Sequence, residues 1–246
     1  RGSALVTLGR DDEAIAAFES ALARNPMDAS AQSGIARVHF ILRGDFARAA
    51  AAYEQALVLN PRAGWSALQL SHCASLLRDF PRADAAARRA IELQQAFLSG
   101  RTGLALVGAH MRLGQVHALQ GRQREALAEY AAEVDFVRRV DHALRGRIVI
   151  ELHQRIGEAH LRLGQAAEGR AALDLAVEAY ERRVRAGAAD AMSPYYAAAA
   201  HALRGDREAA LACLERAAAG RPRLTAARDA IEPSLEPLRD EPRFRA

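Results

Sequence analysis

The fold is decided by the stretch LGRDDEAIAAFESALARNP at residues 8–26. It begins with a turn residue, which is followed by a small residue, then a bulky residue, then a second small residue. These positions are held by Gly9, Ala14, Phe18 and Ala21. Residues at these spacings lie on one face of a helix, so the stretch predicts an amphipathic helix that starts directly after a tight turn.

The same order of residue types returns five more times along the chain. The later copies lie at residues 42–61, 77–93, 119–134, 161–177 and 203–222. Their turn residues, counted from the first copy, are Gly9, Gly44, Arg78, Gly121, Gly164 and Gly205, with separations of 35, 34, 43, 43 and 41 residues. Self-similarity at a regular period predicts an array in which each unit packs on its neighbours.

The longer separations in the second half of the chain predict longer helices. Two segments read as unbroken helices, ALVGAHMRLGQVHALQG at residues 105–121 and VIELHQRIGEAHLRLG at residues 149–164. Alanine and leucine supply most of the apolar residues, and aromatic residues make up only 5% of the chain. This composition favours closely packed helices and an all-α fold.

The repeat resembles the tetratricopeptide repeat (TPR), a helix–turn–helix unit, and Pro26, Pro61 and Pro222 match the proline that closes that repeat. The resemblance covers residues 1–222 and implies a right-handed α-solenoid of about five and a half repeats. The predicted repeats span residues 1–26, 27–61, 62–95, 96–138, 139–183 and 188–222. Residues 223–246 are predicted to form a capping helix and a C-terminal tail.

The first repeat is predicted to be incomplete. Counting back from Gly9 in the register of the family, Arg1 falls halfway along the first helix of its repeat. We therefore expect the chain to be a piece of a longer protein, and we expect its open N-terminal end to allow self-association.

Charge and cysteine content narrow the class of partner and the compartment. The 34 basic residues are all arginine, they face 30 acidic residues, and the net charge is +4. Because Arg and Glu alternate along the predicted helices, as in RRAIE and EAYERRVRAG, we interpret them as solvated helix faces and do not expect nucleic acid to bind.

Cys73 and Cys213 lack metal-ligand spacing, which favours free thiols and a cytoplasmic location. No apolar run is long enough to span a bilayer, so no membrane association is expected. The arginine bias together with the alanine content indicates a GC-rich bacterial genome.

The sequence predicts neither catalysis nor a cofactor. It contains none of the short motifs that mark nucleotide-binding loops, nucleophile elbows or zinc proteases. Histidines recur at equivalent repeat positions, but their separations along and between helices are too large for metal bonds near 2 Å. We interpret them as packing residues and expect no metal. The histidines concerned are His110, His117, His153, His160 and His201.

In the resembling family, the first helix of each repeat lines a concave groove that binds peptides. The candidate groove residues in this chain are Arg37, Trp65, Gln69, His72, Arg112, Gln115, Arg155, Glu158, Tyr195 and Tyr196. Arg112 and Arg155 occupy equivalent positions in adjacent repeats, and two guanidinium groups suit a carboxylate or an acidic peptide. Trp65, Tyr195 and Tyr196 would supply rigid apolar anchors. The chain has no lysine, so the carboxylate clamp of the chaperone-binding members is not expected.

The leading hypothesis is a non-catalytic scaffold or adaptor that binds a peptide or protein segment in its concave groove. The arginines of the groove suit a partner segment that carries acidic groups. The alternative is a C-terminal regulatory or substrate-recruiting module of a larger bacterial enzyme whose catalytic domain lies upstream. A third hypothesis, RNA or DNA binding through arginine, requires a steep dependence of affinity on salt concentration.

Overall fold

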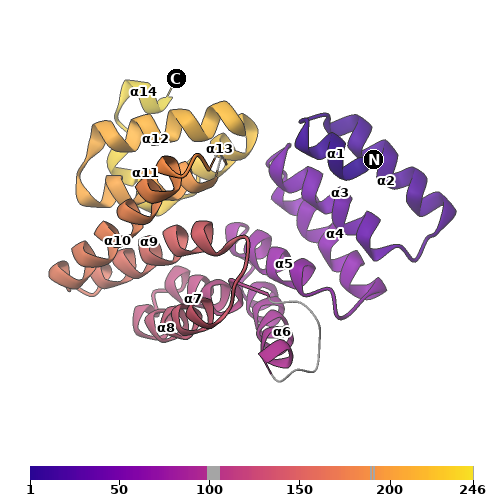
Figure 1. Ribbon diagram of the computed structural model, residues 1–246, viewed down its shortest axis with the longest axis horizontal. Coiled ribbons are helices and arrows are strands. Elements are labelled where there is room, and N and C mark those ends of the chain that lie inside the picture. Colours follow the sequence, from indigo (N-terminus) through magenta and orange to yellow (C-terminus); the bar gives the residue numbers. More distant parts are fainter. Residues whose placement is uncertain (99–105, 189, 191, 246) are drawn as a thin grey trace. The chain divides into compact units, whose positions relative to one another are not determined.

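The computed structural model describes residues 1–98, 106–188, 190 and 192–245. Throughout this described part every regular element is a helix (Figure 1). The chain divides into two compact units, residues 1–116 and residues 117–246, which we call unit 1 and unit 2.

Unit 1 is built from consecutive helix pairs. The pairs are α1 (Gly2–Thr7) with α2 (Asp11–Arg24), α3 (Ala29–Ile41) with α4 (Phe46–Leu59), and α5 (Gly64–Leu76) with α6 (Phe80–Leu98). The next helix, α7 (Ala109–Leu119), begins in unit 1 and ends in unit 2.

Unit 2 continues the same scheme with longer helices and then departs from it. Its helices are α8 (Gln123–Arg139), α9 (Arg145–Arg162), α10 (Ala166–Arg185), α11 (Met192–Arg204) and α12 (Arg207–Gly220). The chain then continues through α13 (Pro222–Asp229), the 3₁₀ helix η1 (Pro233–Leu238) and α14 (Pro242–Arg245). Helix α9 packs against both α10 and α11, and η1 packs against α11.

The six predicted turn residues are confirmed. Each lies between two helices and has a positive φ angle: Gly9 74°, Gly44 64°, Arg78 61°, Gly121 80°, Gly164 75° and Gly205 86°. Glycine adopts this backbone conformation at little cost, which explains why it recurs there. Arg78 has a Cβ atom and holds the same conformation under strain.

The predicted small and bulky positions also form the core. Ala14, Ala49 and Ala210 are completely buried. The ring of Phe18 fits between two glycines, because a Cβ atom added to Gly2 or Gly34 would lie 2.7 Å or 2.4 Å from it. Helices therefore approach closely where the repeat has a small residue, and the bulky residue fills the space beside them.

The predictions of long helices have different outcomes. The prediction for residues 149–164 is confirmed, because α9 has 18 residues and extends to Arg162, whereas α3 has 13. The prediction for residues 105–121 is wrong, because α7 starts only at Ala109. Gly108 precedes it with a φ angle of 100°, which lies outside helical geometry. Residue 105, like the whole stretch 99–105 of the predicted fourth repeat, lies outside the described residues, as do residues 189 and 191 of the sixth.

The interpretation of charged residues as mixed-sign pairs on helix surfaces is confirmed for the two quoted segments. In the segment EAYERRVRAG, Arg182 pairs with Glu178 and Arg185 with Glu181, each one helical turn apart. Such exposed pairs contribute little to stability, but they neutralise the arginines where they stand. In the described part of the chain, no helix is both long and apolar enough to cross a membrane. The repeat boundaries and the right-handed course of the array stay predictions.

Candidate functional site

The first helices of two neighbouring pairs in unit 1 lie side by side. The hydroxyl oxygens of Ser33 on α3 and Ser66 on α5 are 2.7 Å apart. Nearer the C-terminal ends of the two helices, the rings of Phe40 and His72 pack against each other at an angle, with centroids 5.3 Å apart. These contacts define the α3–α5 face, made of Ser33, Arg37, Phe40, Ser66, Gln69 and His72.

Arg37 is the cation of the α3–α5 face. It lies one helical turn from Ser33 on α3 and is half-buried. Its Nε–H is buried and has no hydrogen-bond partner among the residues that the structure describes. Arg37 as a whole is only half-buried, so the other N–H groups of its guanidinium are the ones that can donate to an external acceptor.

The other predicted residues of α5 differ in exposure. Trp65 is the second residue of α5, and 39% of its surface is exposed. Gln69 and His72 are buried, with His72 against the Phe40 ring. Of the three, Trp65 is therefore the one with an apolar surface open to a partner.

Arg112 and Gln115 on α7 bond to each other. Arg112 donates from Nη1 to Gln115 Oε1 at 3.0 Å, and both side chains are buried. Burial raises the pKa of the Cys73 thiol on α5 to about 12, and the Arg112 charge acts in the opposite direction, which places Arg112 close to α5. Arg112 therefore belongs to the interior of unit 1.

In unit 2, α9 carries two carboxylate–guanidinium pairs on one side. Arg155 donates from Nε and Nη2 to Glu151 Oε1 at 3.1 Å and 3.0 Å, and both residues are buried. Arg162 donates to Glu158 in the same way at 3.0 Å and 2.8 Å, nearer the surface. Burial acts to lower the pKa of Arg155, but the carboxylates of Glu151 and Glu232 outweigh it and hold that pKa above its usual range.

A segment from the C-terminal part of the chain lies against these residues. Ser234 of η1 is completely buried, and its hydroxyl lies 2.8 Å from Glu158 Oε2 and accepts a hydrogen bond from Gln154 Nε2 at 3.1 Å. Glu232 Oε1 lies 3.1 Å from the same hydroxyl. We call the surface of Glu151, Gln154, Arg155, Glu158, Tyr195 and Tyr196 the α9–α11 face.

The guanidinium group of Arg228 covers the two tyrosines. It lies 4.1 Å from the centre of the Tyr195 ring and 5.0 Å from that of Tyr196. Its Nη1 donates to the Tyr196 hydroxyl at 3.3 Å, and its Nη2 is 4.0 Å from Glu232 Oε2. Arg228 is fully buried. A desolvated cation over two aromatic rings is a favourable contact, worth about 2 kcal/mol in general.

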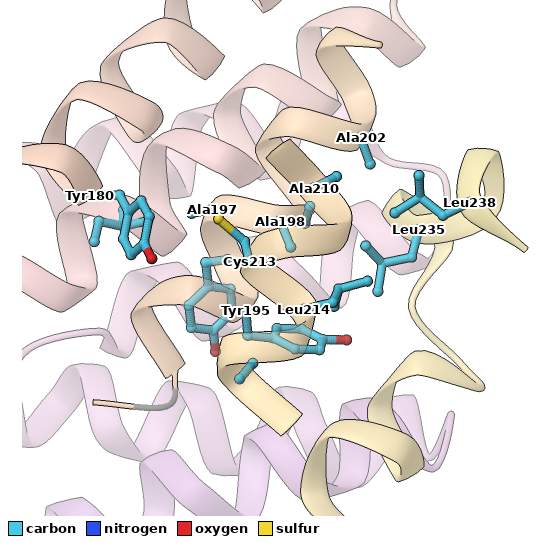
Figure 2. Close-up of a cluster of buried hydrophobic side chains, with 14 of the residues drawn as sticks. Tyr180, Tyr195, Ala197, Ala198, Ala202, Ala210, Cys213, Leu214, Leu235 and Leu238 are labelled. Carbon is cyan, nitrogen blue, oxygen red and sulfur yellow. The ribbon is translucent and has the colours of Figure 1, made fainter. Parts of the chain in front are cut away.

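Two leucines of η1 anchor the segment in the core of unit 2. Figure 2 shows Leu235 and Leu238 directed toward α11 and α12, where they join a cluster that contains Tyr195, Ala198 and Leu214. Both leucines are completely buried. Apolar contacts therefore fix one side of η1, and polar contacts with α9 fix the other.

The structure thus distributes the ten predicted residues over three places. Arg37, Gln69 and His72 meet on the α3–α5 face, with Trp65 at the start of the same helix. Arg112 and Gln115 form a buried pair. Arg155, Glu158, Tyr195 and Tyr196 meet on the α9–α11 face, beneath the chain's own residues 228–235.

Sequence reasoning missed the residues that cover the α9–α11 face, Arg228, Glu232 and Ser234. The signal available for them was IEPSLEPL at residues 231–238, in which Pro233 and Pro237 prevent an α-helix from continuing. An extended or 3₁₀ segment with a short polar pattern can lie in a groove as a peptide does, whereas residues 223–246 were predicted only as a capping helix and a tail.

Two of the predicted packing histidines have local partners. His160 Nδ1 lies 2.8 Å from Gln165 Oε1, and His201 Nδ1 lies 3.3 Å from Asp206 Oδ2. Both contacts bridge the turn between the two helices of a pair. Across the described residues, no group of three or more His, Cys, Asp or Glu side chains comes together in a way that could hold a metal ion.

Comparisons with known proteins identify the repeat. Residues 1–67 match the family model of the tetratricopeptide repeat. A search of curated protein sequences found no significant match. The resemblance stated from the sequence is therefore confirmed in the N-terminal part of the chain.

Solved structures extend the likeness of fold over most of the chain. A TPR protein from Parabacteroides merdae has a TM-score of 0.61 at 13% identity, over 95% of this chain and 81% of that one. PilF from Pseudomonas aeruginosa has a TM-score of 0.56 at 15% identity, over 93% and 94%. The protein MamA has a TM-score of 0.56 at 21% identity, over 75% and 96%. The all-α fold of TPR helix pairs is confirmed by these structures.

Proposed function

Because the chain has TPR sequence in residues 1–67 and the TPR fold beyond them, we propose that it is a non-catalytic scaffold that binds a peptide or protein segment on the first helices of its repeats. TPR proteins are in general protein-interaction scaffolds. The finer proposal, a bound segment at specific residues, rests on the geometry of the two faces.

The observation that carries the proposal is Arg37. Its buried Nε–H lacks a partner among the described side chains, and its neighbours Ser33 and Gln69 are polar. A carboxylate accepts from a guanidinium group in a charge-assisted hydrogen bond, which is stronger than a neutral one. Trp65, half-exposed on the adjacent helix, supplies an aromatic anchor of the kind that dominates binding energy at interfaces. The proposed ligand is therefore an acidic peptide segment with an apolar residue.

The remaining predicted residues enter this proposal in two ways. Gln69 and His72 are buried on α5, with His72 against Phe40, and Arg112 and Gln115 form a buried pair on α7. Arg155, Glu158, Tyr195 and Tyr196 belong to the second face. Cys73 and Cys213 are both free and buried, which suits a reducing compartment, and we propose a cytoplasmic location. For self-association, the exposed Leu8 and Met27 are the candidate contact surface.

The test compares binding of labelled short peptides to the full chain and to single variants. The peptides carry Asp or Glu near a leucine, and matched peptides carry Asn or Gln instead. We expect Arg37→Gln and Trp65→Ala each to weaken binding of the acidic peptides by about tenfold. The control variants are Arg24→Gln and Val58→Ala, which change an exposed arginine and an exposed apolar residue of the same unit away from this face. Equal binding to all five proteins would contradict the proposal.

A further inference from the structure

The C-terminal segment of residues 228–238 contacts the α9–α11 face as a bound peptide would. It places a cation over Tyr195 and Tyr196, a carboxylate near Arg155, and a hydroxyl between Gln154 and Glu158. Two leucines three residues apart enter the apolar cluster beside α11. Each class of contact in peptide recognition, aromatic, charged, hydrogen-bonded and apolar, is thus made by a different residue of a single short segment.

The fit is incomplete at one end of the segment. Arg228 Nε and Nη2 are buried and make no hydrogen bond with any described residue, although Nη2 is 4.0 Å from a Glu232 oxygen. The same holds for the Tyr195 hydroxyl and for Asp229 Oδ1, which lie at the same contact. Each buried polar group without a partner costs free energy, because it has given up its hydrogen bonds to water.

Apolar packing alone does not account for this segment. A cap that only closed the end of an array would need its apolar side, which Leu235 and Leu238 provide. The segment in addition buries Arg228, Glu232 and Ser234, and it leaves several polar atoms unsatisfied. The segment therefore makes the kinds of contact by which a peptide is recognised. Because several of its polar atoms stay unsatisfied, it binds less favourably than a segment that satisfied all of them would, so such a segment could replace it.

We propose that residues 228–238 are an internal ligand of the α9–α11 face and that a segment of a partner protein displaces them. The partner segment carries an Arg or Lys, an acidic residue four positions later, a Ser or Thr two further on, and leucine-sized residues at the spacing of Leu235 and Leu238. The tethered segment competes at high effective concentration, so the face is closed until such a partner is present. This inference rests on the proposed function, since it assumes that first-helix faces bind peptides.

The test uses the full chain and a synthetic, fluorescently labelled peptide of residues 222–240 as the probe. Ser234→Asp in the chain opens the segment, because it puts a carboxylate beside Glu158 and Glu232 while Leu235 and Leu238 remain. The matched control is Ala226→Asp, which adds the same charge at an exposed position of α13. We expect the Ser234→Asp chain to bind the peptide at least about tenfold more tightly than the wild-type and Ala226→Asp chains do.

Two further arms locate the binding. A peptide that itself carries Ser234→Asp should bind the opened chain at least about tenfold more weakly. Gln154→Ala in the opened chain should weaken binding as well, because Gln154 is a partner of Ser234 on α9. Equal binding of the peptide to all three chains, or none to an opened chain that melts cooperatively, overturns the proposal.

Hydrogen exchange on the wild-type chain decides the question if Ser234→Asp prevents folding. Displacement requires the amides of α13 and η1 to exchange through a local opening that leaves α11 protected. If they exchange only together with α11, the segment is an integral part of the fold and the proposal fails. Loss of peptide binding at Arg37 and Trp65 concerns only the proposed function of unit 1, so the two failures are distinguishable.

Discussion

Both units have a face formed by the first helices of neighbouring pairs. The face of unit 1 is partly open, whereas that of unit 2 is covered by another segment of the chain. On the α3–α5 face of unit 1, Arg37 keeps a buried donor unpaired, and Trp65 on α5 is partly exposed. On the α9–α11 face of unit 2, Arg155 is bound by Glu151, and Tyr195 and Tyr196 are covered by Arg228. The residue types that suggest binding are similar, but only one face offers them to a partner.

The difference shows that the repeat register locates a helix face but does not show whether the side chains on it are exposed or covered. Arg37 and Arg155 are both arginines on first helices, yet their charges have different surroundings. Glu151 lies one helical turn before Arg155, whereas the residue at the same spacing before Arg37 is Ser33. One substitution per repeat thus decides whether a guanidinium group is internally neutralised or available.

The largest expected effect on stability follows from removing the carboxylate that pairs with Arg155, because Arg37 has no such partner to lose. Glu151→Gln leaves the buried Arg155 with less compensation, and we expect it to destabilise unit 2 by about 3 kcal/mol in chemical denaturation. The double variant Glu151→Leu/Arg155→Leu removes both charges and should recover most of that loss. A single variant that costs well under 1 kcal/mol would mean that Glu232 alone is enough to compensate Arg155.

A serine hydroxyl gives the next comparison. Ser234→Ala removes a buried group that accepts from Gln154 and lies within hydrogen-bonding distance of Glu158, and we expect a loss of about 1–2 kcal/mol. Ser33→Ala removes one hydroxyl of the part-buried Ser33–Ser66 pair and should cost roughly half as much. Both values come from urea denaturation of the full chain. Equal costs would contradict the view that the hydroxyl of Ser234 is more completely hydrogen-bonded within the chain than that of Ser33.

The third prediction concerns pH and Asp229. Burial raises the pKa of Asp229 to about 6 from its ordinary value of 3.8, against the opposing charge of Arg228 and with a smaller contribution from Glu232. The folded state therefore binds more protons than the unfolded state between about pH 4 and pH 6. The contribution of protonated Asp229 to the stability of the folded state is present at low pH and is lost as the pH rises through that window.

Asp229→Asn tests this sign. Because the variant cannot ionise, it should be more stable than the wild type at pH 7 by on the order of 1 kcal/mol. Its thermal midpoint should also vary less than that of the wild type between about pH 4 and pH 6. The matched variant is Asp240→Asn in the same C-terminal region. A gain that is the same at pH 4 and pH 7 would show that ionisation of Asp229 is not the cause.

The smallest expected effect on stability belongs to the open face. Arg37→Gln should change the free energy of unfolding by no more than about 0.5 kcal/mol, because its Nε–H has no partner to lose among the described residues. The measurement is the same denaturation experiment as for Glu151→Gln. A cost above 1 kcal/mol would show that Arg37 stabilises unit 1, and the contrast between the two faces would disappear.

The sequence by itself determined the repeats and their turns. Gly9, Gly44, Gly121, Gly164 and Gly205 were found by spacing, and each has the left-handed backbone that a helix-to-helix turn needs. Even Arg78 was located in this way, because the small residues that follow it fix the register without a glycine. The small and bulky core positions followed for the same reason: these preferences act within one repeat and are visible in its sequence.

Only the tertiary structure decided which candidate residues are covered. Tyr195 and Tyr196 read as open anchors in their own helix, and nothing near them in sequence points to Arg228, more than 30 residues later. The contacts of Ser234 with Gln154 and Glu158 join residues that lie 80 and 76 positions apart along the chain. Periodicity shows which side of a helix faces its neighbours. It does not show which distant segment covers that side, because the position of such a segment depends on the path of the chain after the last repeat.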